Sequence, residues 1–210
     1  AFRQGGYDGL KVHGGFDQVT YDSIIVAARR EGMPVSGHVT PGYGLHHAMA
    51  SGQQVEHLDG FLHALLRPDY VGPPAGQIVL NPAQLAAIDT TQIAALAAEV
   101  VRRNTWNGPT MALFETIVSD ESTEQILARP DMRTVPAAAR NAWAGQRQNI
   151  LAAPSEQRAQ YVAIRRAILR ALHGAGAKLL IGPDSPQMFL TVGDAVHREL
   201  ASFVDAGLSP

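Results

Sequence analysis

Four side chains that could bind or bridge metal ions follow short apolar segments of this sequence. Lys11, His38 and His57 end three such segments, and Asp184 follows a fourth. Two imidazoles and a carboxylate form a ligand set that suits a divalent metal such as zinc. A metal held in this way can lower the pKa of a bound water to near 7, and so supply the nucleophile that amide or ester hydrolysis needs.

Each of these residues is expected near the C-terminal end of a β-strand. Strands are predicted over residues 8–13, 34–38, 53–57, 177–182 and, less clearly because of Asn107-Gly108-Pro109, 104–111. Helices are predicted over residues 19–31, 45–50, 93–101, 155–173 and 195–206. This alternation predicts βαβ units and an α/β fold. In a parallel barrel the strand ends meet at one mouth, so the four residues should converge there.

Two segments interrupt the alternation. Residues 61–82 contain many prolines and glycines and are predicted to form a long loop that shapes a substrate pocket. Residues 115–153 are rich in alanine and polar residues, and we expect an irregular helical insertion there.

The overall composition excludes several classes of function. The 210 residues are 46% hydrophobic and 17% charged, with a net charge of −2, as in an ordinary soluble globular protein. Basic residues are scattered, so no nucleic-acid-binding face is predicted. No apolar run reaches about 18 residues, so no membrane span is predicted. Cysteine is absent, which excludes disulfides but leaves open whether the protein is cytoplasmic or exported.

Each candidate metal ligand also has a simpler interpretation. A lysine such as Lys11 most often lies on the surface. His38 and His57 could be core histidines with satisfied hydrogen bonds. Asp184 lies in Gly-Pro-Asp-Ser-Pro and could be a turn residue.

Several other residues could line a pocket. Tyr43 follows the strand that ends at His38 and could reach a substrate. His197 begins the last helix, where it could face the substrate or orient a loop. For the remaining histidines near strand ends, a solvated loop position is the simpler interpretation; these are His13, His46, His47 and His63.

Five segments resemble the amidohydrolase superfamily, in particular its imidazolonepropionase-like and prolidase-like metal-dependent hydrolases. They are residues 6–11, 35–39, 55–60, 180–185 and the run from 197–200 to 205–210. They follow the order and spacing of that family over nearly the whole chain except residues 115–153. The resemblance implies a (β/α)₈ TIM barrel, of which this chain would hold strands 4 to 8 and their helices.

The resemblance also implies a role for each candidate residue. Lys11 would be carboxylated and would bridge two divalent metals, with zinc as the expected ion. His38 and His57 would hold the more exposed metal. Asp184 would bind the buried metal and act as the catalytic acid–base group. Tyr43 and His197 stay candidate substrate-binding residues from their positions in the sequence.

The sequence departs from the family pattern at two points. The family carries a His-x-His pair at the end of its first strand, and this sequence contains no such pair. It also reads Gly-Pro-Asp-Ser at residues 182–185, where Gly-Thr-Asp is usual. We therefore expect residues 1–210 to be one barrel domain truncated at both ends and inactive alone. The remainder of a parent chain, or a second copy, would cover its open edge.

The function predicted from the sequence is a metal-dependent, dipeptidase-like hydrolase of C–N bonds. Its substrate would be a small peptide-like molecule or an N-acyl amino acid. Three alternatives stay open: a lactone or phosphotriester hydrolase using the same site, a non-catalytic half-barrel scaffold that lacks the first-strand ligands, and a domain that only stores metal.

Overall fold

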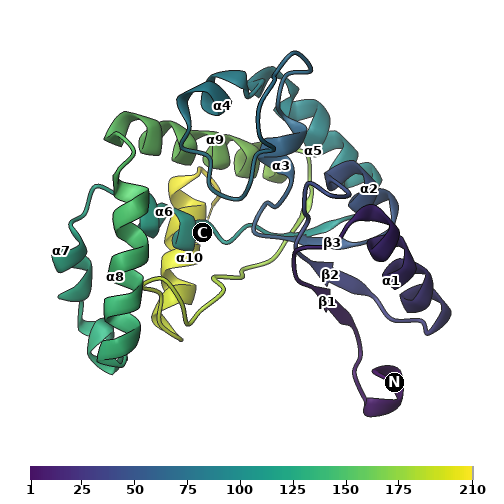
Figure 1. The fold of residues 1–210 in the computed structure, drawn as a ribbon, viewed down its shortest axis with the longest axis horizontal. Coiled ribbons are helices and arrows are strands. Elements are labelled where there is room, and N and C mark those ends of the chain that lie inside the picture. The colour runs from purple at the N-terminus through teal and green to yellow at the C-terminus, as the bar shows by residue number, and fades with distance from the viewer. Residues whose placement is uncertain (210) are drawn as a thin grey trace. The chain divides into compact units, whose positions relative to one another are not determined.

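A computed structural model describes residues 1–209, which form two units (Figure 1). The first unit comprises Ala1–Gln77, Ala87–Gly108 and Ala171–Leu180. The second comprises Ile78–Ala86, Pro109–Arg170 and the chain from Ile181 onward. Two helices, α4 and α9, contribute residues to both units.

The first unit is built on a parallel five-stranded sheet. Its strands are β1 Leu10–Val12, β2 Val35–Gly37, β3 Gln54–Glu56, β4 Trp106–Gly108 and β5 Lys178–Leu179. They pair in sequence order, each parallel to the next, so all five C-terminal ends lie at one edge of the sheet. All five predicted strands are present, and each is shorter than its sequence pattern suggested. The α/β prediction is therefore confirmed.

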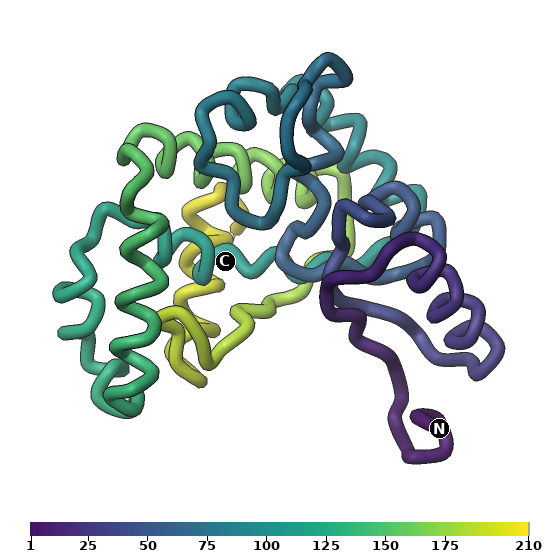
Figure 2. Tube along the Cα trace, viewed as in Figure 1, coloured from purple at the N-terminus to yellow at the C-terminus, as the bar shows by residue number. Residues whose placement is uncertain are grey.

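Helices connect successive strands of this sheet. They are α1 Gln18–Arg30, α2 Leu45–Ala50, α3 Phe61–Ala64 and α5 Ile93–Arg102, with the 3₁₀ helix Thr90–Gln92 before α5. The helix α1 begins where the side chain of Asp17 accepts a hydrogen bond from the Thr20 amide at 2.8 Å. Ahead of β1, the short 3₁₀ helix Arg3–Gly5 belongs to an exposed N-terminal segment that extends away from the sheet (Figure 2).

The prediction of a single loop over residues 61–82 is wrong at both ends. Helix α3 occupies the first four of these residues, and α4, Pro82–Ala87, begins at the last. Phe61 and Leu62 are buried in the core, so tertiary packing stabilises a helix that is too short to show a clear period in the sequence. Proline and glycine are concentrated in the segment between the two helices.

The second unit is helical. Its main helices are α6 Met111–Val118, α7 Thr123–Leu127, α8 Ala137–Leu151, the first part of α9 Ser155–Gly174, and α10 Asp194–Asp205; the 3₁₀ helix Pro130–Thr134 lies between α7 and α8. Residues 115–153 are thus largely helical, whereas their status as an insertion stays a prediction. Seven of the eight residues of α6 are buried, so this helix lies in the core of the unit.

A buried helix still needs partners for the backbone groups at its ends. The Glu199 carboxylate supplies them at the start of α6, where the amides of Met111 and Ala112 donate to its two oxygens at 2.8 and 2.7 Å. Glu199 is fully buried on α10, and its burial raises its pKa to about 7 although the two amide hydrogen bonds lower it. This carboxylate therefore joins α10 to the N-terminus of α6.

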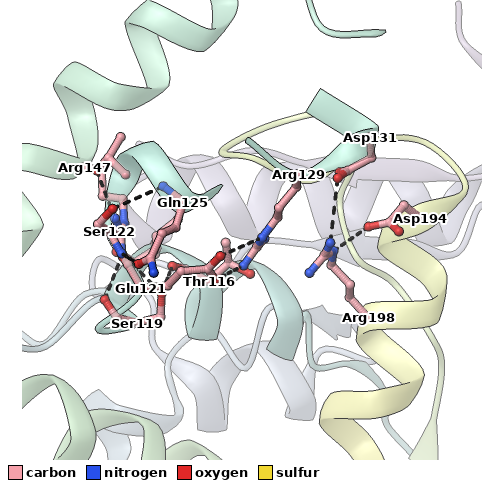
Figure 3. Close-up of polar contacts among 12 residues, drawn as sticks. Thr116, Ser119, Glu121, Ser122, Gln125, Arg129, Asp131, Arg147, Asp194 and Arg198 are labelled. Atoms are coloured by element: carbon pink, nitrogen blue, oxygen red, sulfur yellow. Dashed lines mark hydrogen bonds and ion pairs between the residues drawn. The ribbon is translucent and has the colours of Figure 1, made fainter. Parts of the chain in front are cut away.

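Two arginines bind the carbonyls at the other end of α6. Arg147, fully buried on α8, donates to the carbonyl oxygens of Ile117 and Ser119 at 3.2 and 2.8 Å (Figure 3). Arg158 donates to the carbonyl oxygen of Val118 at 2.7 Å. Cations at a helix C-terminus are favoured by the helix dipole, so the two arginines suit the C-terminal end of α6, while the ionisable Glu199 carboxyl terminates the other end.

Among residues 1–209, no helix combines the length and apolar character that crossing a bilayer requires.

We predict that Glu199 makes stability depend on pH. Its carboxyl has a pKa of about 7 in the folded state and 4.5 as a free group, so the folded state binds the proton more tightly than the unfolded state. The resulting stabilisation of the folded state is complete below pH 4.5 and is lost as the pH rises through 7. The free energy of unfolding, measured with urea, should fall by roughly 3 kcal/mol over this range, because a tenfold change in an equilibrium constant is about 1.4 kcal/mol. Glu199→Gln should remove most of this slope, whereas Glu156→Gln, at an exposed carboxylate, should keep it. An unchanged slope in Glu199→Gln would contradict the assignment.

Candidate metal site at the strand ends

Three of the predicted site residues lie together at the C-terminal edge of the sheet. Lys11 lies in β1, and its Nζ is 2.5 Å from Glu56 Oε2. The same oxygen is 3.5 Å from Nε2 of His57. The ring centroids of His57 and His38 are 4.7 Å apart and their planes are tilted by 33°. Parallel pairing of β1, β2 and β3 thus brings one cationic and two imidazole side chains into one cluster.

The backbone before His38 depends on a glycine. Gly37 ends β2 with a φ of +122°, and an added Cβ there would lie only 2.3 Å from the carbonyl oxygen of Val12. The His38 amide then donates to that same oxygen at 3.0 Å. Only a residue without a side chain allows β1 and β2 to approach this closely, so Gly37 determines where His38 leaves the sheet.

The backbone at His57 is strained. His57 and Leu58 both adopt left-handed conformations, with φ of 63° and 55°, and a bulky residue such as Leu58 rarely does so. The His57 amide donates to the carbonyl oxygen of Gly108 in β4 at 2.6 Å, which fixes the turn. Strain of this kind costs about 1–3 kcal/mol per residue and is concentrated at functional sites. It supports a functional role for the end of β3.

Sequence reasoning missed the carboxylate that holds His38. Nδ1 of His38 lies 2.6 Å from Oδ2 of Asp59, a residue that is 2% exposed. An ionised carboxylate only accepts hydrogen bonds, so Nδ1 carries the hydrogen and Nε2 is left as the nitrogen for a metal. The hydrogen bond to Asp59 raises the pKa of His38. The available signal was an acidic residue two positions after the strand-end residue His57.

Tyr43 supports the backbone of His38 in this structure. Its hydroxyl donates to the His38 carbonyl oxygen at 2.5 Å, and its ring stacks on Tyr21 with centroids 3.8 Å apart. The amide of Gln53 donates to the same carbonyl at 2.9 Å. Tyr43 is buried, and its predicted contact with substrate stays a prediction.

Three other histidines of the first unit divide into two groups. His13 is exposed, and its ring packs edge-on against His38 with centroids 4.7 Å apart, so it borders the cluster of Lys11, His38 and His57. His46 pairs with Glu99 at 2.9 Å, and His47 pairs with Asp22 at 2.6 Å. These two side chains contact acidic residues of α5 and α1.

The remaining predicted site residues belong to the second unit. Asp184 has a φ of 56° and accepts a hydrogen bond from the side-chain amide of Gln187. His197 is an exposed residue of α10. The convergence of Asp184 with the cluster in the first unit stays a prediction.

The side chains of His38 and His57 could form part of a metal site. Within residues 1–209, no group of three or more His, Asp and Glu side chains is arranged to hold a metal ion. The pair His38 and His57 offers two imidazole ligands, whereas a lysine ammonium has no lone pair with which to bind a metal. A carbamate of Lys11 would add an oxygen ligand to the two imidazoles.

Comparisons with known proteins identify a shared fold. No protein-family model and no curated protein matches the chain. A solved bottromycin amidohydrolase is similar in structure, with a TM-score of 0.67 and 22% identity over 99% of this chain and 44% of that chain. A Xaa-Pro dipeptidase with methionine bound in its active site aligns with a TM-score of 0.49 and 17% identity, over 98% of this chain and 40% of that one. This chain spans less than half the length of either protein, and its likeness to the first shows a common α/β fold.

We predict that Gly37→Ala lowers the free energy of unfolding by roughly 2–4 kcal/mol, because the new Cβ must displace the β1 backbone. Chemical denaturation measures this change. Gly145→Ala is the matched control, since Gly145 lies inside α8 with open space around it, and it should raise stability by up to about 1 kcal/mol. Equal stabilities of the wild type and Gly37→Ala would show that the close approach of β1 and β2 is not required.

Proposed function

We propose that this chain carries part of the active site of a metal-dependent hydrolase that cleaves C–N bonds, on a sheet that forms part of a (β/α)₈ barrel. One observation carries the proposal: His38 and His57 lie side by side at adjacent strand ends, and Asp59 orients His38 so that Nε2 is available. Carboxylate–histidine pairs of this kind are typical of protein metal sites. The fold shared with an amidohydrolase supports the same reaction class.

Each predicted site residue would have a separate role in metal binding or proton transfer. His38 and His57 would hold one divalent metal, and Lys11, as a carbamate, would bridge it to a second, with zinc as the preferred ion. Metals bound there would acidify a water molecule and polarise the amide carbonyl. Asp184 would accept the proton of the attacking water and deliver it to the leaving nitrogen.

The neighbourhood of Lys11 constrains when a carbamate can form. Glu56 lies against the Lys11 ammonium, so carboxylation would exchange an attractive pair for two adjacent anions. A divalent cation next to both anions would compensate for that repulsion. Carboxylation of Lys11 and metal binding should therefore occur together.

The favoured substrates are small peptide-like molecules or N-acyl amino acids. The segment between α3 and α4 follows β3 and α3, and loops that follow strand ends line substrate pockets in α/β folds. This substrate class would place an amide carbon within reach of the cluster formed by Lys11, His38 and His57.

A non-catalytic scaffold is the second candidate function. One observation favours it: His, Asp and Glu side chains form no three-ligand metal group within residues 1–209. The two functions differ in a simple measurement, because a scaffold would bind no zinc at His38 and His57, whereas a hydrolase domain would.

We predict that the purified chain binds zinc through its two imidazoles. His38→Ala and His57→Ala should each lower the zinc content after equilibrium dialysis to background, because a single remaining imidazole is a weak ligand. His173→Ala changes an exposed histidine at the end of α9 and should leave the zinc content unchanged. Equal zinc content in all four proteins would exclude this site.

We predict that Lys11→Ala loses bound metal and hydrolytic activity together in the longest available form of the protein. Short carboxylic acids such as acetate or propionate should restore part of both, since they can replace the carbamate as a bridging anion. Metal analysis and hydrolysis of dipeptides measure the two effects. Full activity of Lys11→Ala without added acid would rule out the bridging role.

A further inference from the structure

The segment between α3 and α4 reaches the metal-site cluster through one side chain. Gln77 lies near the end of this segment, and its Nε2 donates to Oδ1 of Asp59 at 2.8 Å. The same nitrogen lies 3.2 Å from Nδ1 of His38. Because the other oxygen of Asp59 binds His38, the carboxylate is held on both sides.

The segment that carries Gln77 is itself restrained. Pro68, Pro73 and Pro74 limit its backbone conformations. The amide of Ala75 donates to Nδ1 of His63, on α3, at 3.3 Å, and Ala75 is buried. Gln77 therefore reaches Asp59 from a backbone that is fixed two residues earlier.

The geometry decides which tautomer of His38 is present. If Nδ1 lacked a hydrogen, it would face the Asp59 carboxylate, and two acceptors would lie 2.6 Å apart. A hydrogen on Nδ1 instead gives a charge-assisted bond, which is the stronger alternative. Rotation of Asp59 would release this restraint, and the Gln77 amide opposes that rotation.

We propose that Gln77 is a positioning residue. Through Asp59 it fixes the orientation and tautomer of His38, and so couples the segment between α3 and α4 to the affinity of the metal site. The effect on metal affinity rests on the proposed function, whereas the effect on the tautomer of His38 does not.

The first test measures zinc affinity by competition with a chromophoric chelator. Gln77→Leu should weaken binding about 10-fold, the lower end of the range found when the outer partner of a metal-binding histidine is removed. Gln92→Leu is the matched control, because Gln92 is exposed in the same unit and its side-chain amide donates to the Thr91 hydroxyl at 3.4 Å; it should bind zinc like the wild type.

A double-mutant cycle tests whether Gln77 acts through Asp59. Gln77→Leu should weaken zinc binding in the wild-type background and have little further effect once Asp59→Ala is present. Equal effects in the two backgrounds would overturn the proposed route.

The second readout needs no metal. In mildly alkaline buffer, nitrogen-15 chemical shifts of the His38 ring report which nitrogen carries the hydrogen. The wild type and Gln92→Leu should show the hydrogen on Nδ1, and Gln77→Leu should show a larger share on Nε2. An unchanged tautomer in Gln77→Leu would overturn the inference. If the wild type bound no zinc but the tautomer shifted as expected, the proposed function would fail while the positioning role of Gln77 would stand.

Discussion

Parallel pairing of five strands in sequence order is the constraint on which the candidate site depends. Two successive parallel strands cannot be joined by a tight turn, so the chain must cross back to the other edge of the sheet before each new strand begins. Every strand then ends at the same edge. Strand pairing alone therefore makes neighbours of three residues that are far apart in the sequence, Lys11, His38 and His57.

Most of the strands and helices could be predicted from the sequence, because the spacing of apolar residues indicates which face of each element is buried. The helix predicted over residues 45–50 coincides with α2, and the predicted strands all occur. The short helix α3 escaped prediction since its four residues span a single turn, too few to show a period. The strand ends were also placed too far along the chain, because His57 leaves the extended conformation for a left-handed one that no apolar pattern reveals.

Side-chain pairing over long distances in the sequence is the part that could not be predicted. Asp59 binds a histidine 21 residues earlier, and Gln77 lies 39 residues beyond that histidine. The position of Asp59 two residues after His57 is a weak local signal, and Gln77 has none. Their roles follow from burial and from the shared carboxylate, which are properties of the folded chain. Lys11, in contrast, was identified from its position, although its contact with Glu56 was not foreseen.

Glu199 has a consequence for how the second unit opens. The first amides of a helix normally exchange their hydrogens with solvent quickly, because they lack partners within the helix. In α6 the amides of Met111 and Ala112 are bound to a buried carboxylate of α10. Their exchange must await the separation of the two helices, so α6 and α10 should open as one cooperative unit rather than fray independently.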